Sequence, residues 1–218
     1  MTKPFSRAAL SPENITLLNR GRWGNANLFK YRCGDGAWVV KDFLHCPLPV
    51  RCTWGSFMVS RELRALDRLK GIEGIPENSF LLDKFALCYR YISGRTLKES
   101  RRLHLDTGYF VALEQLVRAM HERNIVHLDI RYMRNILITS LGRPALLDFQ
   151  SSIFLENMPH SLHKLLKNVD ISGVYKCWHK IAPETMDTKR LDLLNAMEKK
   201  RSLWIFKGYP LNKLFSRH

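Results

Sequence analysis

The feature that most constrains this chain is a pair of polar segments separated by a short apolar stretch that is typical of a β-hairpin. The polar segments cover residues 127–135 and 147–150, and residues 140–144 between them contain the glycine and proline of a tight reversal. In an antiparallel hairpin, residues equidistant from the turn lie opposite one another. We therefore expect Asn135 and Asp148, at the outer ends of the two strands, to be neighbours.

An amide oxygen and a carboxylate that converge in this way suit Mg²⁺, which prefers oxygen ligands and completes its octahedron with water and substrate phosphates. Asp129, just before the hairpin, adds a second carboxylate. The alternative is that Asp129 and Asp148 only cap turns. Because the ordered pair is less expected by chance than either aspartate alone, the sequence favours a metal and phosphate site.

These segments resemble the protein kinase-like superfamily, whose catalytic loop reads His-Arg-Asp followed by Asn and whose metal-binding motif reads Asp-Phe-Gly. The corresponding stretches here read His-Leu-Asp, ending at Asp129, and Asp-Phe-Gln, beginning at Asp148. The resemblance implies that ATP is the phosphate donor, that Asp129 is the catalytic base, and that Asn135 and Asp148 bind Mg²⁺. It also implies that Arg131 stabilises the phosphate during transfer.

A degenerate glycine-rich nucleotide loop is predicted upstream, at residues 18–26. Gly21 and Gly24 would let backbone N–H groups approach the phosphates, and Trp23 at the tip would shield them from water. Asn19 stands where the superfamily prefers its first glycine. The alternative interpretation is a plain turn between two strands.

Residues 37–41 read as a strand, in which Val39 and Lys41 share one face because side chains alternate along a strand. An edge lysine with its ammonium group in water is the alternative. Residues 53–70 have helical periodicity, and Glu62 falls on the apolar stripe of that helix. An inward-facing glutamate needs a cation, for which Lys41 is the candidate. The resemblance implies that this pair holds the ATP phosphates.

Two further residues are predicted to support the catalytic loop. His127 follows the apolar Ile125 and Val126, and we expect it to be a core histidine rather than a proton donor. Asp170 is predicted at the start of a helix that resembles the central helix of the superfamily's C-terminal lobe, where an aspartate anchors the catalytic loop. Capping of the helix N-terminus is a competing role, and the two roles are compatible.

Three departures from the superfamily pattern stand out. Asn135 lies six residues after Asp129, one more than usual, so the loop must absorb a bulge. Leu128 replaces the arginine that pairs with a phosphorylated activation loop, and Gln150 replaces the glycine of the metal-binding motif. The short interval after Asp148 resembles the compact bacterial sugar or lipid kinases, including lipopolysaccharide sugar kinases, and the RIO-like kinases.

The implied fold is α+β and bilobal, with a β-rich N-lobe over residues 1–91 and a mainly helical C-lobe over residues 92–218. The 218 residues suffice for one catalytic unit of this kind. Five cysteines without paired Cys-x-x-Cys spacing argue against a disulfide framework or zinc ribbon. Because the opening residues also lack a secretory signal, we expect a cytoplasmic protein.

A net charge of +15 favours an acidic partner. Basic and aromatic residues alternate over residues 199–217, a mixture found at membrane surfaces. The sequence favours a C-terminal helix that packs its aromatic residues on the lobe. The alternative is contact of the tail with an anionic membrane, which would place the protein peripherally at the inner membrane surface.

The sequence thus predicts an ATP- and Mg²⁺-dependent phosphotransferase that acts on a protein serine or threonine, or on an anionic lipid or lipopolysaccharide sugar. The first alternative is a nucleotide-binding pseudokinase that serves as a binding module. The second is a basic nucleic-acid-binding protein, but no dedicated motif supports it, and nucleic acid is not an expected partner.

Overall fold

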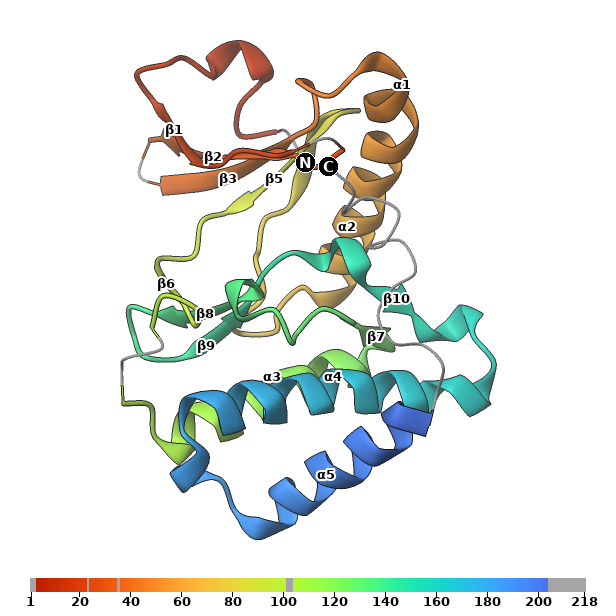
Figure 1. Cartoon of the computed structure of the whole chain (residues 1–218). Coiled ribbons are helices and arrows are strands. Elements are labelled where there is room, and N and C mark those ends of the chain that lie inside the picture. The colour runs from red at the N-terminus through yellow and green to blue at the C-terminus, as the bar shows by residue number, and fades with distance from the viewer. Residues whose placement is uncertain (1–2, 23, 35, 101–103, 204–218) are drawn as a thin grey trace.

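The computed structural model describes residues 3–22, 24–34, 36–100 and 104–203. The chain forms an α+β molecule with two lobes, as the sequence predicts (Figure 1). We use N-lobe for the elements from β1 to β5 and C-lobe for those from β6 onward. The proposed division between residues 91 and 92 falls in the connection from β5 to β6.

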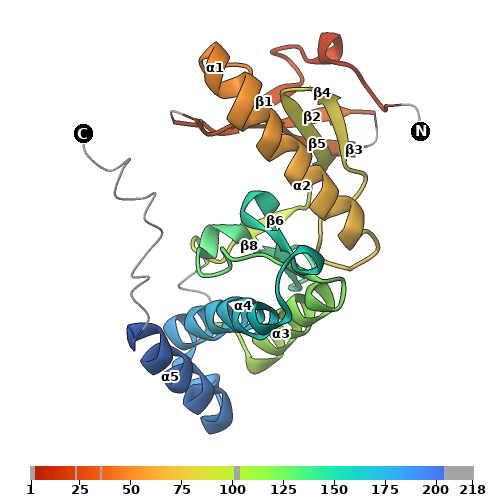
Figure 2. The same ribbon diagram turned by 90° about the vertical axis from the view of Figure 1, so that its right-hand side faces the viewer.

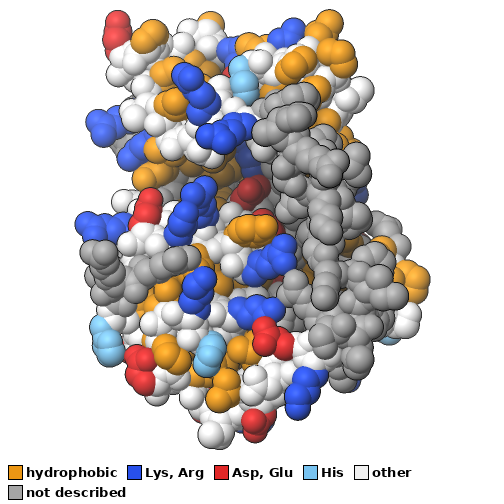
Figure 3. Space-filling model, viewed as in Figure 1, with side chains coloured by type: hydrophobic (Ala, Val, Ile, Leu, Met, Phe, Trp, Pro, Cys, Tyr) orange, Lys and Arg blue, Asp and Glu red, His pale blue; other side chains and the backbone are white. Residues whose placement is uncertain are grey.

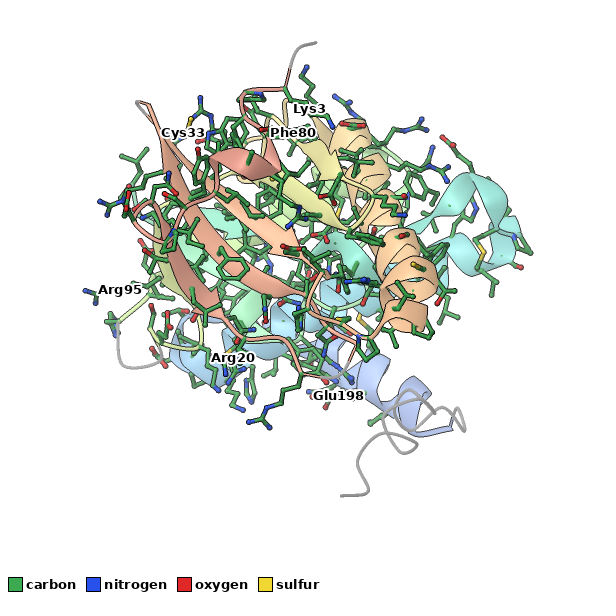
Figure 4. The ribbon with its side chains drawn as sticks, turned by 90° about the horizontal axis from the view of Figure 1, so that it is seen from above. Lys3, Arg20, Cys33, Phe80, Arg95 and Glu198 are labelled. Carbon is green, nitrogen blue, oxygen red and sulfur yellow. The ribbon has the colours of Figure 1, made fainter. Side chains whose placement is uncertain are left out.

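The N-lobe is built on a five-stranded antiparallel sheet. Alternation along its third strand places Val39 and Lys41 on the face that meets the main core, while Trp38 and Val40 join a smaller apolar cluster on the other face. The strands are β1 (Ile15–Asn19), β2 (Asn27–Cys33), β3 (Gly36–Asp42), β4 (Phe80–Asp83) and β5 (Ala86–Arg90), in the spatial order β1-β2-β3-β5-β4. Seen from above, Lys3 and Phe80 lie together at one end of the sheet (Figure 4).

One helical segment crosses from the N-lobe towards the C-lobe (Figure 2). It starts as α1 (Leu48–Val50), continues through a π-helical turn (Arg51–Gly55) and becomes α2 (Ser56–Leu69). The predicted stripe of α2 is confirmed, because its four residues are at most 5% exposed: Met58, Glu62, Leu66 and Leu69. Glu62 is therefore an acid within an apolar face.

The C-lobe core lies between α3 (Thr107–Glu122) and α4 (His160–Ile181), with α5 (Thr188–Leu203) packed on α4 (Figure 1). Four apolar residues of α3 at helical spacing are fully buried: Phe110, Leu113, Val117 and Met120. The rings of Phe110 and Trp178 stack with centroids 5.2 Å apart, which joins α3 to α4. The aromatic residues of the tail that is predicted to pack on the lobe or to contact a membrane, residues 204–218, lie outside the described residues.

Short strands of the C-lobe flank the two polar segments, residues 127–135 and 147–150. The strands are β6 (Gly94–Thr96), β7 (Ile125–Val126), β8 (Ile136–Thr139), β9 (Pro144–Leu146) and β10 (Ile153–Phe154). β6, β8 and β9 form one small sheet, and β7 pairs with β10. Short 3-10 turns complete the chain: η1 (Arg7–Ala9), η3 (Met133–Asn135), η4 (Phe149–Ser151), η5 (Leu155–Asn157) and η6 (Pro183–Thr185).

The predicted hairpin is present as β8 and β9, but its register differs by one residue from the expected one. Ile136 lies opposite Leu146, and the N–H of Leu147 donates to the carbonyl of Asn135 at 2.8 Å. Asn135 is therefore opposite Leu147 rather than Asp148. The chain reverses around Leu141, with Gly142 at φ 73°, whereas the spacing of polar residues suggested a reversal between Leu141 and Gly142.

The prediction that a helix begins near Asp170 is wrong. α4 begins at His160, so Asp170 lies within the helix and does not cap it. The first ten residues of α4 are exposed or half-buried, yet Leu162, Leu165, Leu166 and Val169 recur at helical spacing, so periodicity could have found this part of the helix. Pro159, immediately before the helix, was a second usable signal.

The described residues include no helix long and apolar enough to cross a membrane. None of the five cysteines, all of which lie in the described part of the chain, is in a disulfide. Across the described part of the chain, no cluster of three or more potential metal-binding His, Cys, Asp or Glu residues occurs.

Candidate active site

The central feature between the lobes is a lysine that bonds two carboxylates. Lys41 Nζ donates to Glu62 Oε2 and to Asp148 Oδ1, each at 2.7 Å. Lys41 comes from β3, Glu62 from α2, and Asp148 from the turn after β9, so this contact joins three elements. The space-filling view shows acidic side chains in a hollow between the lobes, with Lys and Arg side chains around it (Figure 3).

Burial differs sharply among these three groups. The side chains of Lys41 and Glu62 are 6% and 1% exposed, whereas that of Asp148 is 43% exposed. The buried pair therefore forms the floor of the site, and Asp148 faces its solvent-filled opening. A ligand that enters the hollow would meet Asp148 and the ammonium group of Lys41.

The charges of the three groups determine one another. Burial alone would lower the pKa of Lys41, but the carboxylates of Asp148 and Glu62 outweigh this effect and raise it. Burial would raise the pKa of Asp148, but Lys41 lowers it. Burial raises the pKa of Glu62 against the opposing charge of Lys41. Lys41 is thus charged and shared between two acids, which leaves negative charge for a cation.

Residues 127–135, which we call the catalytic loop after the superfamily segment that they resemble, bring Asp129 and Asn135 together. Asn135 Nδ2 donates to Asp129 Oδ2 at 2.9 Å and to the Asp129 carbonyl at 3.2 Å. This double contact holds the loop closed despite its extra residue. Burial raises the pKa of Asp129 to about 6, with Asn135 opposing the shift. The carboxylate is mostly ionised at neutral pH and suited to accept a proton.

Two non-glycine residues of the site have left-handed backbones. Leu128 and Asp148 both have φ of 65°, a conformation that such residues adopt only when their surroundings impose it. At Leu128 the constraint is Asp170, whose Oδ1 accepts the Leu128 N–H and whose Oδ2 accepts the His127 N–H, both at 2.7 Å. The anchoring role predicted for Asp170 is thus present in the structure.

His127 has the surroundings of a core histidine. The residue is fully buried. The centroids of its ring and the Phe149 ring are 4.8 Å apart, and its Nε2 lies 3.0 Å from the carbonyl oxygen of Leu147. These contacts tie the catalytic loop to the end of the hairpin.

Asp170→Ala is expected to lower the free energy of unfolding by roughly 2–5 kcal/mol, because it leaves the buried N–H groups of His127 and Leu128 without an acceptor. Urea denaturation measures the effect. The matched control is Asp192→Ala on α5, where the aspartate is exposed and little change is expected. Equal stabilities of the two variants would contradict the anchoring role.

The glycine-rich loop between β1 and β2 is tightly closed at one glycine. The N–H of Gly21 donates to Asn27 Oδ1 at 2.9 Å, and a Cβ added at Gly21 would lie 2.1 Å from the Asn25 carbonyl oxygen. A Cβ at Gly24 would be in ordinary contact, 3.5 Å from the nearest atom of Val50. Trp23 lies outside the described residues.

Gly21→Ala is therefore expected to displace the loop and weaken ATP binding by about tenfold or more, because backbone atoms of residues 25 and 26 must move. Gly24→Ala is the matched control, with an expected change below about threefold. Isothermal titration calorimetry with Mg·ATP separates the two results. Equal affinities for both variants would show that the geometry of this loop does not contribute to nucleotide binding.

The remaining predicted residue, Arg131, lies half-buried in the catalytic loop, with its guanidinium carbon 5.1 Å from the Tyr132 ring centroid. Its positive charge is among those that act on Asp129. Gln150, which replaces the motif glycine, lies in η4, and its Nε2 has no hydrogen-bond partner in the described part of the chain.

Sequence reasoning missed three arginines of α2: Arg61, Arg64 and Arg68. They contact the segment that follows Asp148. Their spacing of three and four residues places them on one helix face, which is the signal that could have found them.

A β-rich lobe and a helical lobe, with a Lys–Glu pair and two aspartate-bearing turns between them, define a protein of the kinase-like superfamily. A family model described as the RIO domain matches residues 53–191, and the chain belongs to the RIO family of atypical, kinase-like, ATP-binding proteins. No curated protein matches the chain.

The matched range includes Glu62, Asp129 and Asp148 but begins after Lys41 and the glycine-rich loop. The structure connects Lys41 to the matched range through its hydrogen bonds to Glu62 and Asp148. Membership of the RIO family implies the use of ATP and Mg²⁺ in general, but it does not identify the phosphate acceptor.

Proposed function

We propose that this protein is an ATP- and Mg²⁺-dependent phosphotransferase whose acceptor is an alcohol group. The observation that carries the proposal is the bridge from Lys41 to both Glu62 and Asp148. This bridge supports the proposal because it holds Lys41 where nucleotide phosphates would enter, beside the solvent-exposed carboxylate of Asp148. A structural ion pair alone would not need the second, exposed carboxylate.

The donor set fits Mg²⁺. Asp148 offers a solvent-facing carboxylate, and Asn135 uses its amide nitrogen for Asp129, which leaves its amide oxygen as a potential ligand. Asn135 and Asp148 would hold the ion, which would neutralise charge on the phosphates. Lys41, positioned by Glu62, would bind the phosphates, and the N–H groups around Gly21 and Gly24 would cover them, with Trp23 as a shield.

Asp129 is the proposed base. Its carboxylate would orient the acceptor hydroxyl and accept its proton, and its contact with Asn135 fixes its position beside the metal ligands. Arg131 would stabilise negative charge on the transferred phosphate. Positioning and electrostatics supply most of the catalysis in phosphoryl transfer.

An acidic acceptor is the proposed substrate class: a protein serine or threonine, or an anionic lipid or lipopolysaccharide sugar. The net charge of +15 supports it, as do the Lys and Arg side chains on both sides of the hollow (Figure 3). Arg95, on the C-lobe margin, extends outward (Figure 4). We propose a cytoplasmic protein whose tail contacts an anionic membrane peripherally, without nucleic acid as a partner.

Labelled ATP tests this proposal directly. Purified protein is incubated with Mg²⁺ and [γ-³²P]ATP and, in separate reactions, with a protein extract and with lipid or lipopolysaccharide fractions. We expect label in one fraction only, dependent on Mg²⁺. Transfer that persists with excess EDTA would contradict the proposal, and label in a protein band or a lipid fraction would identify the acceptor class.

The alternative is a nucleotide-binding pseudokinase. The six-residue spacing from Asp129 to Asn135 favours it, because the loop is one residue longer than the catalytic loop of the superfamily. ATP binding by calorimetry, with no transfer to any fraction, would support this alternative. Nucleic-acid binding that weakens strongly with salt and is lost when the tail is truncated would instead point to a basic nucleic-acid-binding protein.

A further inference from the structure

One face of α2 is lined by arginines that contact the chain just after Asp148. Arg61, Arg64 and Arg68 lie at helical spacing, and their contacts fall successively on Ser152, Phe154 and Glu156. We call these three residues the arginine face. The helix and the segment thus run alongside each other, and the views in Figures 1 and 2 show α2 approaching the C-lobe there.

Arg61 donates hydrogen bonds to the backbone of this segment. Its Nε and one terminal nitrogen donate to the carbonyl oxygen of Ser152, at 2.9 and 2.6 Å, and the same terminal nitrogen is 3.4 Å from the Ser151 carbonyl oxygen. Ser152 is fully buried, so its carbonyl needs an internal donor. A guanidinium fork satisfies it with a charge-assisted bond.

The other two arginines extend the contact along the helix. The guanidinium carbon of Arg64 lies 5.1 Å from the ring centroid of Phe154, within range of a cation–π interaction. Arg68 forms an ion pair with Glu156, and its Nε donates to the carbonyl of Arg123 at 3.3 Å. Both are more exposed than Arg61 and contribute less.

The elements joined in this way are those that carry the Lys41 ligands. Glu62 directly follows Arg61 on α2, and its second oxygen accepts the N–H of Phe149 at 3.2 Å. The Ser152 hydroxyl donates to the Phe149 carbonyl at 2.6 Å, which closes the turn after Asp148. Fixing Ser152 on Arg61 therefore fixes the distance between the Glu62 and Asp148 backbones.

We propose that the arginine face, and Arg61 above all, positions the Asp148 turn against α2. Lys41 can then bond both carboxylates without any modification of the chain after Asp148. This proposal rests on the proposed function for its catalytic meaning. Leu128 agrees with this proposal, because it replaces the arginine that would bind a phosphorylated activation loop.

The test compares Arg61→Met, Arg61→Lys and wild type by hydrogen exchange of residues 149–154 and by calorimetric Mg·ATP affinity at several Mg²⁺ concentrations. Arg32→Met, which removes an exposed arginine from β2, is the matched control. For Arg61→Met we expect about tenfold faster exchange and about tenfold more Mg²⁺ for half-maximal ATP binding. Arg61→Lys should recover part of both, because its ammonium group still donates one bond.

The proposal would be overturned if Arg61→Met changed neither the hydrogen exchange of residues 149–154 nor the Mg²⁺ dependence of ATP binding. A lower melting temperature with an unchanged Mg²⁺ dependence would also overturn it, because that result indicates a structural role only. If Arg61→Met does not fold, Arg61→Lys decides by the same two measurements. Neither readout needs phosphoryl transfer, so wild-type protein that binds Mg·ATP without transfer would refute the proposed function and leave this inference testable.

Discussion

Asp129→Asn is expected to reduce phosphoryl transfer by about 10²–10⁴-fold, the usual contribution of a general base. The asparagine keeps the shape of the side chain and its contact with Asn135 but cannot accept the acceptor's proton. Because Asp129 contacts neither Lys41 nor Glu62 in the structure, the affinity for Mg·ATP should change by less than about threefold. Initial rates of label transfer and calorimetric titration measure the two quantities.

The matched control is Asp192→Asn on the exposed side of α5, which should leave both quantities unchanged. Equal transfer rates for Asp129→Asn and wild type would exclude Asp129 as the base. Loss of Mg·ATP binding together with transfer would instead assign Asp129 to the metal site.

Lys41→Met is expected to have two effects of different origin. Transfer should fall by about 10²–10³-fold, because a cation aimed at the phosphates is lost. The free energy of unfolding should fall by roughly 3–5 kcal/mol, because Glu62, 1% exposed, is left as an unpaired buried acid. Urea denaturation and label transfer measure these effects, with Lys70→Met at the exposed end of α2 as the control.

The double variant Lys41→Met/Glu62→Leu separates the two effects. Replacing a buried ion pair by apolar residues of similar size is often close to neutral for stability. We therefore expect the double variant to regain most of the lost stability while transfer stays at the level of Lys41→Met. Recovery of transfer together with stability would mean that Lys41 has no role in phosphate binding.

Local pattern was sufficient where one periodicity dominates a segment. The alternation around Val39 and Lys41 predicted the facing of β3, and the stripe that contains Glu62 predicted the buried face of α2. In both segments the apolar residues share a single face, so burial of that face leaves one arrangement of the polar residue among them.

Local pattern was misread at one helix start and was insufficient where the structure depends on exact turn length. The start of α4 was misplaced because the helix was expected to begin at the buried Asp170, although Leu162, Leu165 and Leu166 already recur at helical spacing before it. The hairpin register was one residue off because polar spacing does not specify how tightly the chain turns at Gly142.

The sequence by itself determined that a lysine, a glutamate and two aspartates needed partners, since charged groups on apolar faces or in strained turns are costly alone. Only the tertiary structure decided which partners they have. Lys41 and Asp148 are separated by 107 positions, and the bond between them depends on how the two lobes pack. The same holds for Arg61 on the Ser152 carbonyl and for Asp170 on the catalytic loop. Periodicity specifies which face of an element is buried, whereas the approach of two faces from distant elements is set by the packing of the whole core.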